Sequence, residues 1–135
     1  MSFMEWSDKF ELKISDIDQQ HKQLLSMVNE MHDAMKNRKG KDVLADILKR
    51  LIDYTQKHFA TEEKYFETHH YPDSLKHKME HKALTQKVIE LNEKFNKGDL
   101  FITVEVMNFI RDWLTNHILK SDLKYGSYLR ERGVR

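Results

Sequence analysis

Two pairs of potential metal ligands lie close together in the middle of the sequence. His58 and Glu62 form the first pair, and His77 and His81 form the second; the members of each pair are four residues apart. Residues four apart on a helix lie on the same face, with Cβ atoms about 5–6 Å apart. Each pair can therefore direct two ligand groups toward one point. Imidazole and carboxylate groups are typical ligands of first-row transition metals, so the pattern predicts a metal site.

A turn separates these two pairs. The segment Tyr71-Pro72-Asp73 lies between them. Because proline cannot continue a helix, one helix must end before this segment and another begin after it. The first pair then lies near the end of one helix and the second near the start of the next, and an antiparallel hairpin brings the four ligands together.

The composition favours a helical protein. The chain has 135 residues with one proline and four glycines, which favours one domain over residues 1–135 built from long helices. It has no cysteine, so disulfides, thiolate ligands and thiol catalysis are excluded. The formal net charge of +1 gives no electrostatic argument for binding nucleic acid or an anionic membrane.

Nothing in the sequence indicates membrane insertion or export. The apolar runs are too short to span a bilayer. The first six residues lack the basic and apolar regions of a signal peptide. We therefore expect a soluble, cytoplasmic, monomeric protein.

The apolar pattern predicts four main helices, over residues 17–38, 42–69, 73–96 and 103–120. In each of them apolar residues recur at every third or fourth position. Residues 1–16 lack this pattern and are expected to form an extended arm packed across the bundle, and residues 122–132 a short C-terminal helix. Asp16 or Asp18 is expected to cap the first helix. Because the predicted loops are short, the fold class is all-α, an up-down-up-down antiparallel four-helix bundle.

This topology gathers the candidate ligands at one end of the bundle. The start of the first helix, the end of the second, the start of the third and the end of the fourth carry, in that order, His21, His58 with Glu62, His77 with His81, and His117. One pair of histidines four apart arises by chance about half of the time in a chain with eight histidines, and a lone histidine on an apolar face is usually a hydrogen-bonded core residue. Agreement among four helices favours a metal site, because unpaired buried imidazoles and carboxylates cost several kcal/mol.

Asp122 is a seventh candidate, and spacing supports it least. It follows His117 by five residues, and five residues of a regular helix turn through about 500°. Asp122 can join the site only if the helix ends or bulges there; such bulges are frequent at functional sites, so we predict that Asp122 is a ligand. The remaining histidines, His32, His69 and His70, lie too far from the cluster to bind the same ions and are expected to be structural or exposed. Two carboxylates beside the cluster, Glu63 and Glu80, are expected to face solvent.

Five histidines and two carboxylates are too many ligands for one ion. They suit two ions bridged by the carboxylates, and a set of imidazole and carboxylate ligands without thiolate fits iron among other first-row metals. The number of donors therefore predicts a dinuclear centre.

The motifs that contain these residues resemble those of the hemerythrin family, in particular the single-domain bacteriohemerythrins. The resemblance covers nearly the whole chain and rests on Trp6, Ile17-Asp18-x-Gln20-His21-Lys22, His58-Phe59-x-x-Glu62-Glu63, Tyr71-Pro72, His77-x-x-x-His81 and Trp113-Leu114-x-x-His117-Ile118-x-x-x-Asp122. Two positions differ from the family pattern: Lys13 and His70 stand where the family often has glycine.

The resemblance implies two iron ions, Fe2+ or Fe3+, with a bridging oxo or hydroxo group. One iron would be bound by His77, His81 and His117, the other by His21 and His58, with Glu62 and Asp122 bridging the two. With the three bridges, the first iron has six ligands and the second has five. The open position on the second iron is where O2 is expected to bind as peroxide, in a pocket walled by Leu25, Phe59, Trp113, Leu114 and Ile118.

The predicted function is reversible O2 binding for storage, delivery or sensing. Ferritin-like oxygen-activating bundles use four Glu and two His, whereas five neutral imidazoles are expected to stop the reaction at reversible peroxide. NO and small anions such as azide would bind at the same position, and a protein acceptor of O2 is a further expected partner. Two alternatives remain: a di-iron oxidase, peroxidase or NO-handling enzyme, and an O2- or redox-sensing domain of a larger receptor.

Overall fold

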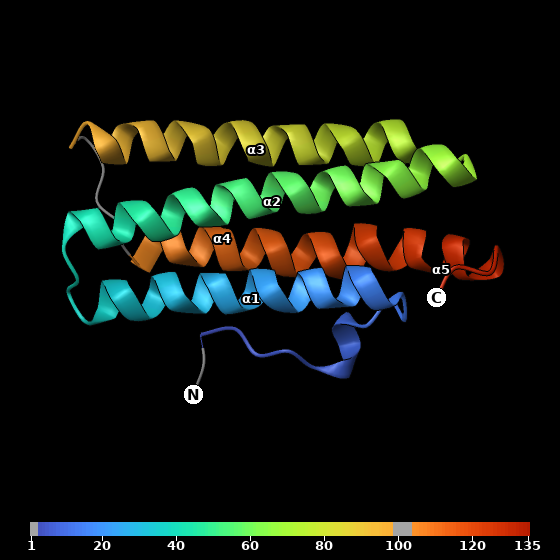
Figure 1. Ribbon diagram of the computed structural model, residues 1–135, viewed down its shortest axis with the longest axis horizontal. Coiled ribbons are helices and arrows are strands. Elements are labelled where there is room, and N and C mark those ends of the chain that lie inside the picture. Colours follow the sequence, from blue (N-terminus) through green and yellow to red (C-terminus); the bar gives the residue numbers. More distant parts are fainter. Residues whose placement is uncertain (1–2, 99–103) are drawn as a thin grey trace.

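The computed structural model describes residues 3–98 and 104–135, and these residues are helical or irregular throughout. The helices in the described ranges are α1 (Ser15–Lys36), α2 (Lys41–His69), α3 (Ser74–Asn96), α4 (Val104–His117) and α5 (Leu123–Glu131), with a short helix η1 (Asp8–Phe10) in the arm and a π-helical turn η2 (Ile118–Asp122) after α4. Figure 1 shows α1 to α4 side by side, each antiparallel to the next. The predicted up-down-up-down bundle is therefore confirmed.

The helices differ from their predicted boundaries mainly at the ends. Helix α1 begins at Ser15, two residues before the predicted start, with Ile14 as N-cap and no capping side chain. The expected capping role of Asp16 or Asp18 is wrong: Asp18 lies within α1, and its carboxylate accepts the backbone N–H groups of Leu12 and Lys13 at 2.9 and 3.0 Å. The predicted start of the fourth helix at residue 103 lies outside the described residues.

Hydrogen bonds and apolar packing hold the N-terminal arm against the bundle. Met4 exchanges two hydrogen bonds with the side chain of Asn29, at 2.7 and 2.8 Å. Leu12 is completely buried and packs against Gly126 of α5, where an added Cβ would lie 3.0 Å from Leu12 Cγ. The glycine at position 126 permits this close approach, because a side chain there would displace Leu12, and the approach holds the arm against α5.

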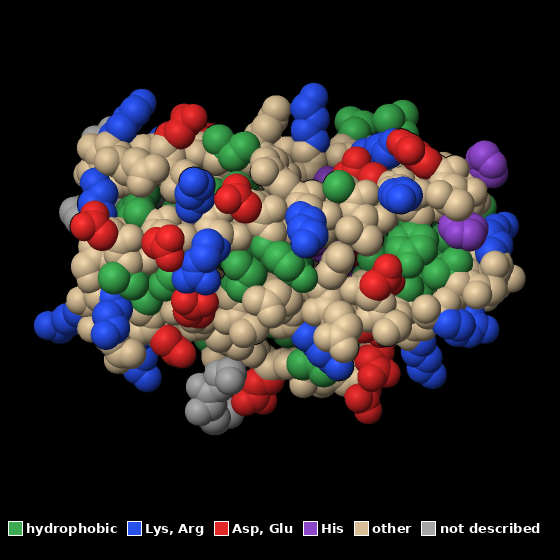
Figure 2. Space-filling model, viewed as in Figure 1, with side chains coloured by type: hydrophobic (Ala, Val, Ile, Leu, Met, Phe, Trp, Pro, Cys, Tyr) green, Lys and Arg blue, Asp and Glu red, His purple; other side chains and the backbone are tan. Residues whose placement is uncertain are grey.

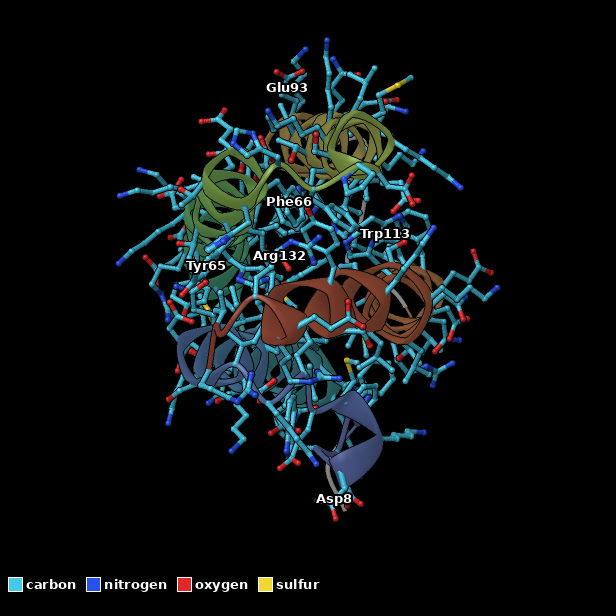
Figure 3. The ribbon with its side chains drawn as sticks, turned by 90° about the vertical axis from the view of Figure 1, so that its right-hand side faces the viewer. Asp8, Tyr65, Phe66, Glu93, Trp113 and Arg132 are labelled. Atoms are coloured by element: carbon cyan, nitrogen blue, oxygen red, sulfur yellow. The ribbon has the colours of Figure 1, made fainter. Side chains whose placement is uncertain are left out.

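The apolar faces of the helices form one core along the bundle axis. Figure 3 views the bundle from the end at which α2 ends and α3 begins, with Phe66 between the helices and Glu93 on the outside. The face shown in Figure 2 mixes basic and acidic side chains, as the near-zero net charge leads one to expect. Within the described ranges, no helix combines the length and the apolar character needed to cross a bilayer.

Candidate metal centre

All seven residues predicted as ligands meet inside one end of the bundle. Each is buried, with at most 6% of its surface exposed. Their ligand atoms form two groups that share two carboxylates: the first group is Glu62, His77, His81, His117 and Asp122, and the second is His21, His58, Glu62 and Asp122. We call these the three-histidine position and the two-histidine position.

The π-helical turn explains how Asp122 joins the cluster. Helix α4 ends at His117, and in the following turn the N–H of Leu123 donates to the carbonyl of Ile118, five residues earlier. A turn with this i→i+5 spacing places residues five apart on the same face, whereas an α-helix does not. The side chains of His117 and Asp122 consequently point to the same position, with Nε2 and Oδ1 only 3.1 Å apart.

Asp122 lies between the two positions. Its Oδ1 is 3.0 Å from His77 Nε2 and faces the three-histidine position, while its Oδ2 is 3.1 Å from His21 Nε2 and faces the two-histidine position. One carboxylate oxygen is thus available to each of two ions.

Glu62 also contacts both groups, but through a different arrangement of its oxygens. Its Oε1 lies 3.1 Å from His81 Nε2 and 3.4 Å from His58 Nε2. Its Oε2 lies 3.8 Å from His21 Nε2 and accepts a hydrogen bond from the hydroxyl of Tyr125. Tyr125 is completely buried and its ring lies against that of His77, so this hydrogen bond fixes the Glu62 carboxylate from within the core.

The donor atoms fit metal ions better than they fit one another. Among the described residues, nine buried nitrogen and oxygen atoms of these seven side chains lack a hydrogen-bond partner, although several lie only 3.0–3.1 Å apart. Metal–ligand bonds of about 2.1 Å in an octahedral arrangement place neighbouring donors about 3 Å apart. Buried polar atoms left without partners are costly, so this layer of the core has the spacing and the unused lone pairs of a metal site.

The pKa values of the two histidines at the two-histidine position shift in opposite directions in the metal-free cluster. Burial lowers the pKa of His21, but the closeness of Asp122 and Glu62 outweighs burial and raises the pKa to about 10. For His58 burial dominates and lowers the pKa to about 4. Burial would raise the pKa values of Glu62 and Asp122, and repulsion by Asp122 would raise that of Glu62 further, but the surrounding histidines hold both below the ordinary range. Both carboxylates are therefore ionised and able to bind cations.

Polar contacts outside the donors, two hydrogen bonds and one ion-pair contact, orient three of the histidines. The outward Nδ1 atoms lie 2.6 Å from Gln20 Oε1 for His58, 2.9 Å from Glu63 Oε2 for His81, and 3.2 Å from Glu80 Oε2 for His117. Such partners fix the ring and leave Nε2 free for a metal. The apolar pattern and the ligand spacing of the sequence do not indicate these contacts.

The expectation that Glu63 and Glu80 face solvent is wrong. Their side chains are 31% and 34% exposed and contact the ligand histidines from the rim of the site. Each stands next to a ligand in the sequence, Glu63 after Glu62 and Glu80 before His81. A carboxylate beside a ligand on a buried helix face is the signal that could have identified them, because a ligand histidine usually donates its second N–H to such a group.

A small apolar cavity of about 40 Å³ adjoins the cluster. Its lining includes three residues of the predicted O2 pocket, Phe59, Trp113 and Leu114. Phe59 stacks on the ring of His81 with centroids 3.7 Å apart, and Trp113 stacks on His117 at 4.5 Å, so the cavity wall continues directly into the donor layer. The other two predicted residues, Leu25 and Ile118, are buried in the core but do not line this cavity; Leu24 does.

The three remaining histidines lie outside both donor groups. His32 stacks on Phe3 of the arm with centroids 4.1 Å apart, and His69 stacks on Tyr65. His70 follows α2 as its C-cap, in a left-handed conformation with φ of 53°. Their positions agree with the structural or exposed roles expected for them.

Fold and site together describe a four-helix bundle with a buried donor cluster of the size and composition that suits two metal ions. The family model "Hemerythrin HHE cation binding domain" matches residues 12–129. The bacteriohemerythrin of Methylococcus capsulatus is 35% identical over 130 residues, which cover 96% of this chain and 98% of that protein. The bacteriohemerythrin of Clostridium acetobutylicum is 34% identical over 125 residues, with 89% and 96% covered.

A solved structure agrees with these matches. The crystal structure of wild-type hemerythrin superposes with a TM-score of 0.89 at 35% identity, covering 93% of this chain and 97% of that one. The chain belongs to the hemerythrin family.

Proposed function

We propose that this protein binds O2 reversibly at a non-haem di-iron centre. The observation that carries the proposal is the pair of donor groups that share Glu62 and Asp122 but differ in their number of histidines, three against two. An unequal pair leaves the two-histidine position with fewer protein donors and therefore with room for a small ligand. The relatives named bacteriohemerythrin and hemerythrin support the choice of iron and O2.

The proposed ligands are assigned by group. Iron at the three-histidine position would be held by His77, His81 and His117, iron at the two-histidine position by His21 and His58, with Glu62 and Asp122 shared and a solvent-derived oxo or hydroxo bridge completing the centre. When bound, two ferrous ions supply the electrons for reversible reduction of O2. Imidazole and carboxylate donors without thiolate suit this metal.

The protein's own residues orient the metal ligands and exclude water from the site. Tyr125 holds the shared carboxylate of Glu62, and Gln20 holds the ring of His58. The cavity beside Phe59, Trp113 and Leu114 offers an apolar space to a small uncharged molecule. An apolar wall also limits access of water and protons, which favours release of O2 over its further reduction.

We further propose that the protein acts as a carrier, store or sensor of O2 in the cytoplasm and works as a monomer, with NO and azide as competing ligands of the same position. A protein that accepts O2 from it would be its macromolecular partner. The alternative of an oxidase, peroxidase or NO-handling enzyme uses the same centre and differs in needing a supply of electrons at each turnover.

One experiment tests the proposed function. The purified protein is supplied with Fe2+ under anaerobic conditions, its iron is counted, and its absorption spectrum is recorded before oxygenation, after oxygenation and after degassing. We expect two irons per chain and a charge-transfer band that appears with O2 and disappears on degassing. A chain that holds no pair of irons, or whose centre consumes O2 catalytically in the presence of a reductant, would overturn the carrier proposal.

A further inference from the structure

We propose that Glu63 and Glu80 make the three-histidine position the one that is oxidised first and that holds Fe3+ more strongly. The inference rests on the proposed di-iron function and concerns residues outside the donor groups. It begins from a difference between the polar contacts that surround the two positions.

Carboxylates support the three-histidine position. Glu63 Oε2 lies 2.9 Å from the Nδ1 of His81, and Glu80 Oε2 lies 3.2 Å from the Nδ1 of His117. A carboxylate that accepts the Nδ1–H of a ligand histidine makes the opposite nitrogen a stronger donor. Each also places a negative charge one imidazole away from the metal position, which favours the more positive oxidation state.

The two-histidine position lacks this support. The Nδ1 of His58 pairs with the neutral side-chain amide of Gln20, at 2.6 Å, and the amide nitrogen of Gln20 in turn lies 3.4 Å from Thr61 Oγ1. The Nδ1 of His21 is buried and has no hydrogen-bond partner among the described residues. An amide oxygen polarises an imidazole less than a carboxylate does, so these two donors remain weaker.

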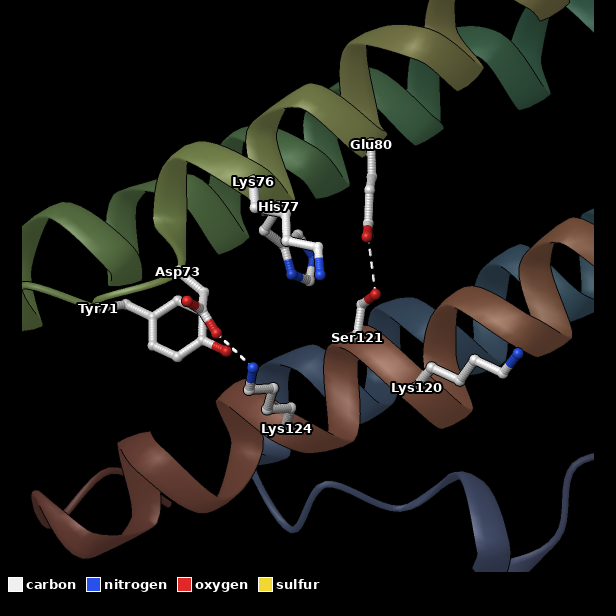
Figure 4. Close-up of a pocket in the computed structure, with 8 residues that line it drawn as sticks. All are labelled: Tyr71, Asp73, Lys76, His77, Glu80, Lys120, Ser121 and Lys124. Atoms are coloured by element: carbon white, nitrogen blue, oxygen red, sulfur yellow. Dashed lines mark hydrogen bonds and ion pairs between the residues drawn. The ribbon is translucent and has the colours of Figure 1, made fainter.

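Neither carboxylate is paired with a basic side chain among the described residues. Within the described part of the chain, neither Glu63 nor Glu80 forms an ion pair with lysine or arginine; their ion-pair contacts are with His81 and His117. Figure 4 shows Glu80 at the edge of a polar pocket between α3 and η2, hydrogen-bonded to Ser121 Oγ at 2.7 Å, while Lys124 of the same pocket pairs with Asp73. The hydroxyl of Ser121 orients Glu80 toward His117 without neutralising it.

These contacts give the two positions different electronic character. The three-histidine position has three imidazoles, two of them supported by carboxylates, and the two-histidine position has two imidazoles without such support. The order of oxidation should follow this difference. The position proposed for O2 then has the less electron-rich donors, and electrons leave first from the position that lies beside Glu63 and Glu80.

Glutamine substitutions test this inference because they remove the charge and keep the shape. The variants are Glu63→Gln, Glu80→Gln and the double variant, with Glu67→Gln as matched control. Glu67 lies one turn further along α2, is 72% exposed and pairs only with Lys78 among the described residues. The converse variant, Gln20→Glu, places a carboxylate beside His58.

The main measurement is a redox titration of the iron-loaded proteins, which resolves two one-electron midpoint potentials. Loss of an outer hydrogen-bond partner commonly weakens metal binding by about 10- to 100-fold. We expect each glutamine variant to weaken binding of Fe3+ relative to Fe2+ by about tenfold, which raises the lower midpoint by about 59 mV. The double variant should shift it further, Glu67→Gln should leave both midpoints unchanged, and Gln20→Glu should lower the upper midpoint.

A second measurement separates charge from mere positioning. Binding of Zn2+ to the metal-free proteins is followed by competition with a chelator, because Zn2+ does not change its oxidation state. The inference requires a smaller effect of Glu63→Gln and Glu80→Gln on Zn2+ affinity than on Fe3+ affinity. Unchanged midpoints, or equal losses for Zn2+ and Fe3+, would overturn it. If the wild-type protein does not bind two irons, the proposed function is wrong, and this is known before any variant is tested. If it binds two irons but the midpoints do not shift in the variants, only the present inference is wrong.

Discussion

Two neighbouring layers of one bundle have opposite characters. Helix α3 contributes His77 and His81 to the donor layer and, further along the same face, Leu84 and Val88 to the apolar layer. The spacing is the same in both layers, and all four side chains are buried. The donor layer leaves polar atoms without partners, whereas the adjoining layer encloses a small apolar cavity.

The comparison shows that helical periodicity decides which residues are buried but not whether their burial is favourable. Burial of Leu84 and Val88 contributes favourable transfer free energy, at about 25 cal/mol per Å² of apolar surface. Burial of imidazoles and carboxylates costs free energy unless they are paired or bind a cation. The apolar layers must therefore hold the donor layer in place until metal binding stabilises it, and variants of the two layers should have separable effects.

The largest expected effect comes from removing a donor. His117→Ala and Glu62→Ala should lose bound iron, because the first removes an imidazole of the three-histidine position and the second removes a carboxylate that both positions share. His32→Ala is the control, since His32 contacts the arm and not the cluster. Iron is counted against protein concentration after anaerobic loading and desalting. Equal loss of iron from all three variants would show that the assignment of the site is wrong.

The metal-free protein should be most stable near pH 6.5. The pKa of His21 is raised to about 10 in the folded state, so its contribution to stability is present below pH 6.5 and is lost as the pH rises toward 10. The pKa of His58 is lowered to about 4, so its contribution is present above pH 6.5 and is lost as the pH falls toward 4. The lowered pKa values of Glu62 and Asp122 add to the loss in acid.

Urea unfolding followed by circular dichroism between pH 4 and 10 measures this profile. Each of the two histidines should change the free energy of unfolding by a few kcal/mol across its range. His21→Gln should flatten the alkaline side and His58→Gln the acid side. Metal binding requires neutral imidazoles, so loading with metal should also remove the alkaline decline. A metal-free protein whose stability keeps rising from pH 6.5 to 10 would contradict the raised pKa of His21.

A smaller effect is expected from the apolar layer. Leu114→Ala should lower the free energy of unfolding by about 2–3 kcal/mol, because Leu114 is buried at the wall of a cavity that already exists. It should also speed autoxidation of the oxygenated protein by admitting water.

The control for this variant is Leu48→Ala, because Leu48 is buried on α2 and does not line the cavity. It should lose similar stability and leave autoxidation unchanged. Thermal or urea unfolding and the decay of the oxygenated spectrum measure the two properties. Unchanged autoxidation in Leu114→Ala, or equal acceleration in both variants, would remove Leu114 from the proposed O2 pocket.

The sequence predicts the bundle and the convergence of six donors because both follow from periodicity along regular helices. Spacing gives Asp122 the weakest support of the seven predicted ligands, because the π-helical turn that it needs depends on tertiary packing rather than on local preference. The sequence also misplaces Glu63 and Glu80: they lie at the border of the buried face, where the pattern does not distinguish a solvated carboxylate from one that contacts a ligand histidine. The pattern predicts Asp18 as a helix cap, but its carboxylate accepts a hydrogen bond from the backbone of the arm. The apolar pattern does not determine the path of the arm, so this contact is not predicted.

The smallest expected effect tests the loop that joins the two ligand-bearing helices. His70 adopts φ of 53°, a left-handed conformation that costs a non-glycine residue about 1–2 kcal/mol. His70→Gly removes this cost, while the greater freedom of glycine in the unfolded chain offsets about 0.4–1 kcal/mol. The Tyr128 hydroxyl donates to the backbone carbonyl of His70, which glycine retains. We expect a gain of about 0.5–1 kcal/mol in the free energy of unfolding. His69→Gly, in the last turn of α2, is the matched control and should lose about 1 kcal/mol. A loss of stability in both variants would show that the left-handed turn carries no strain.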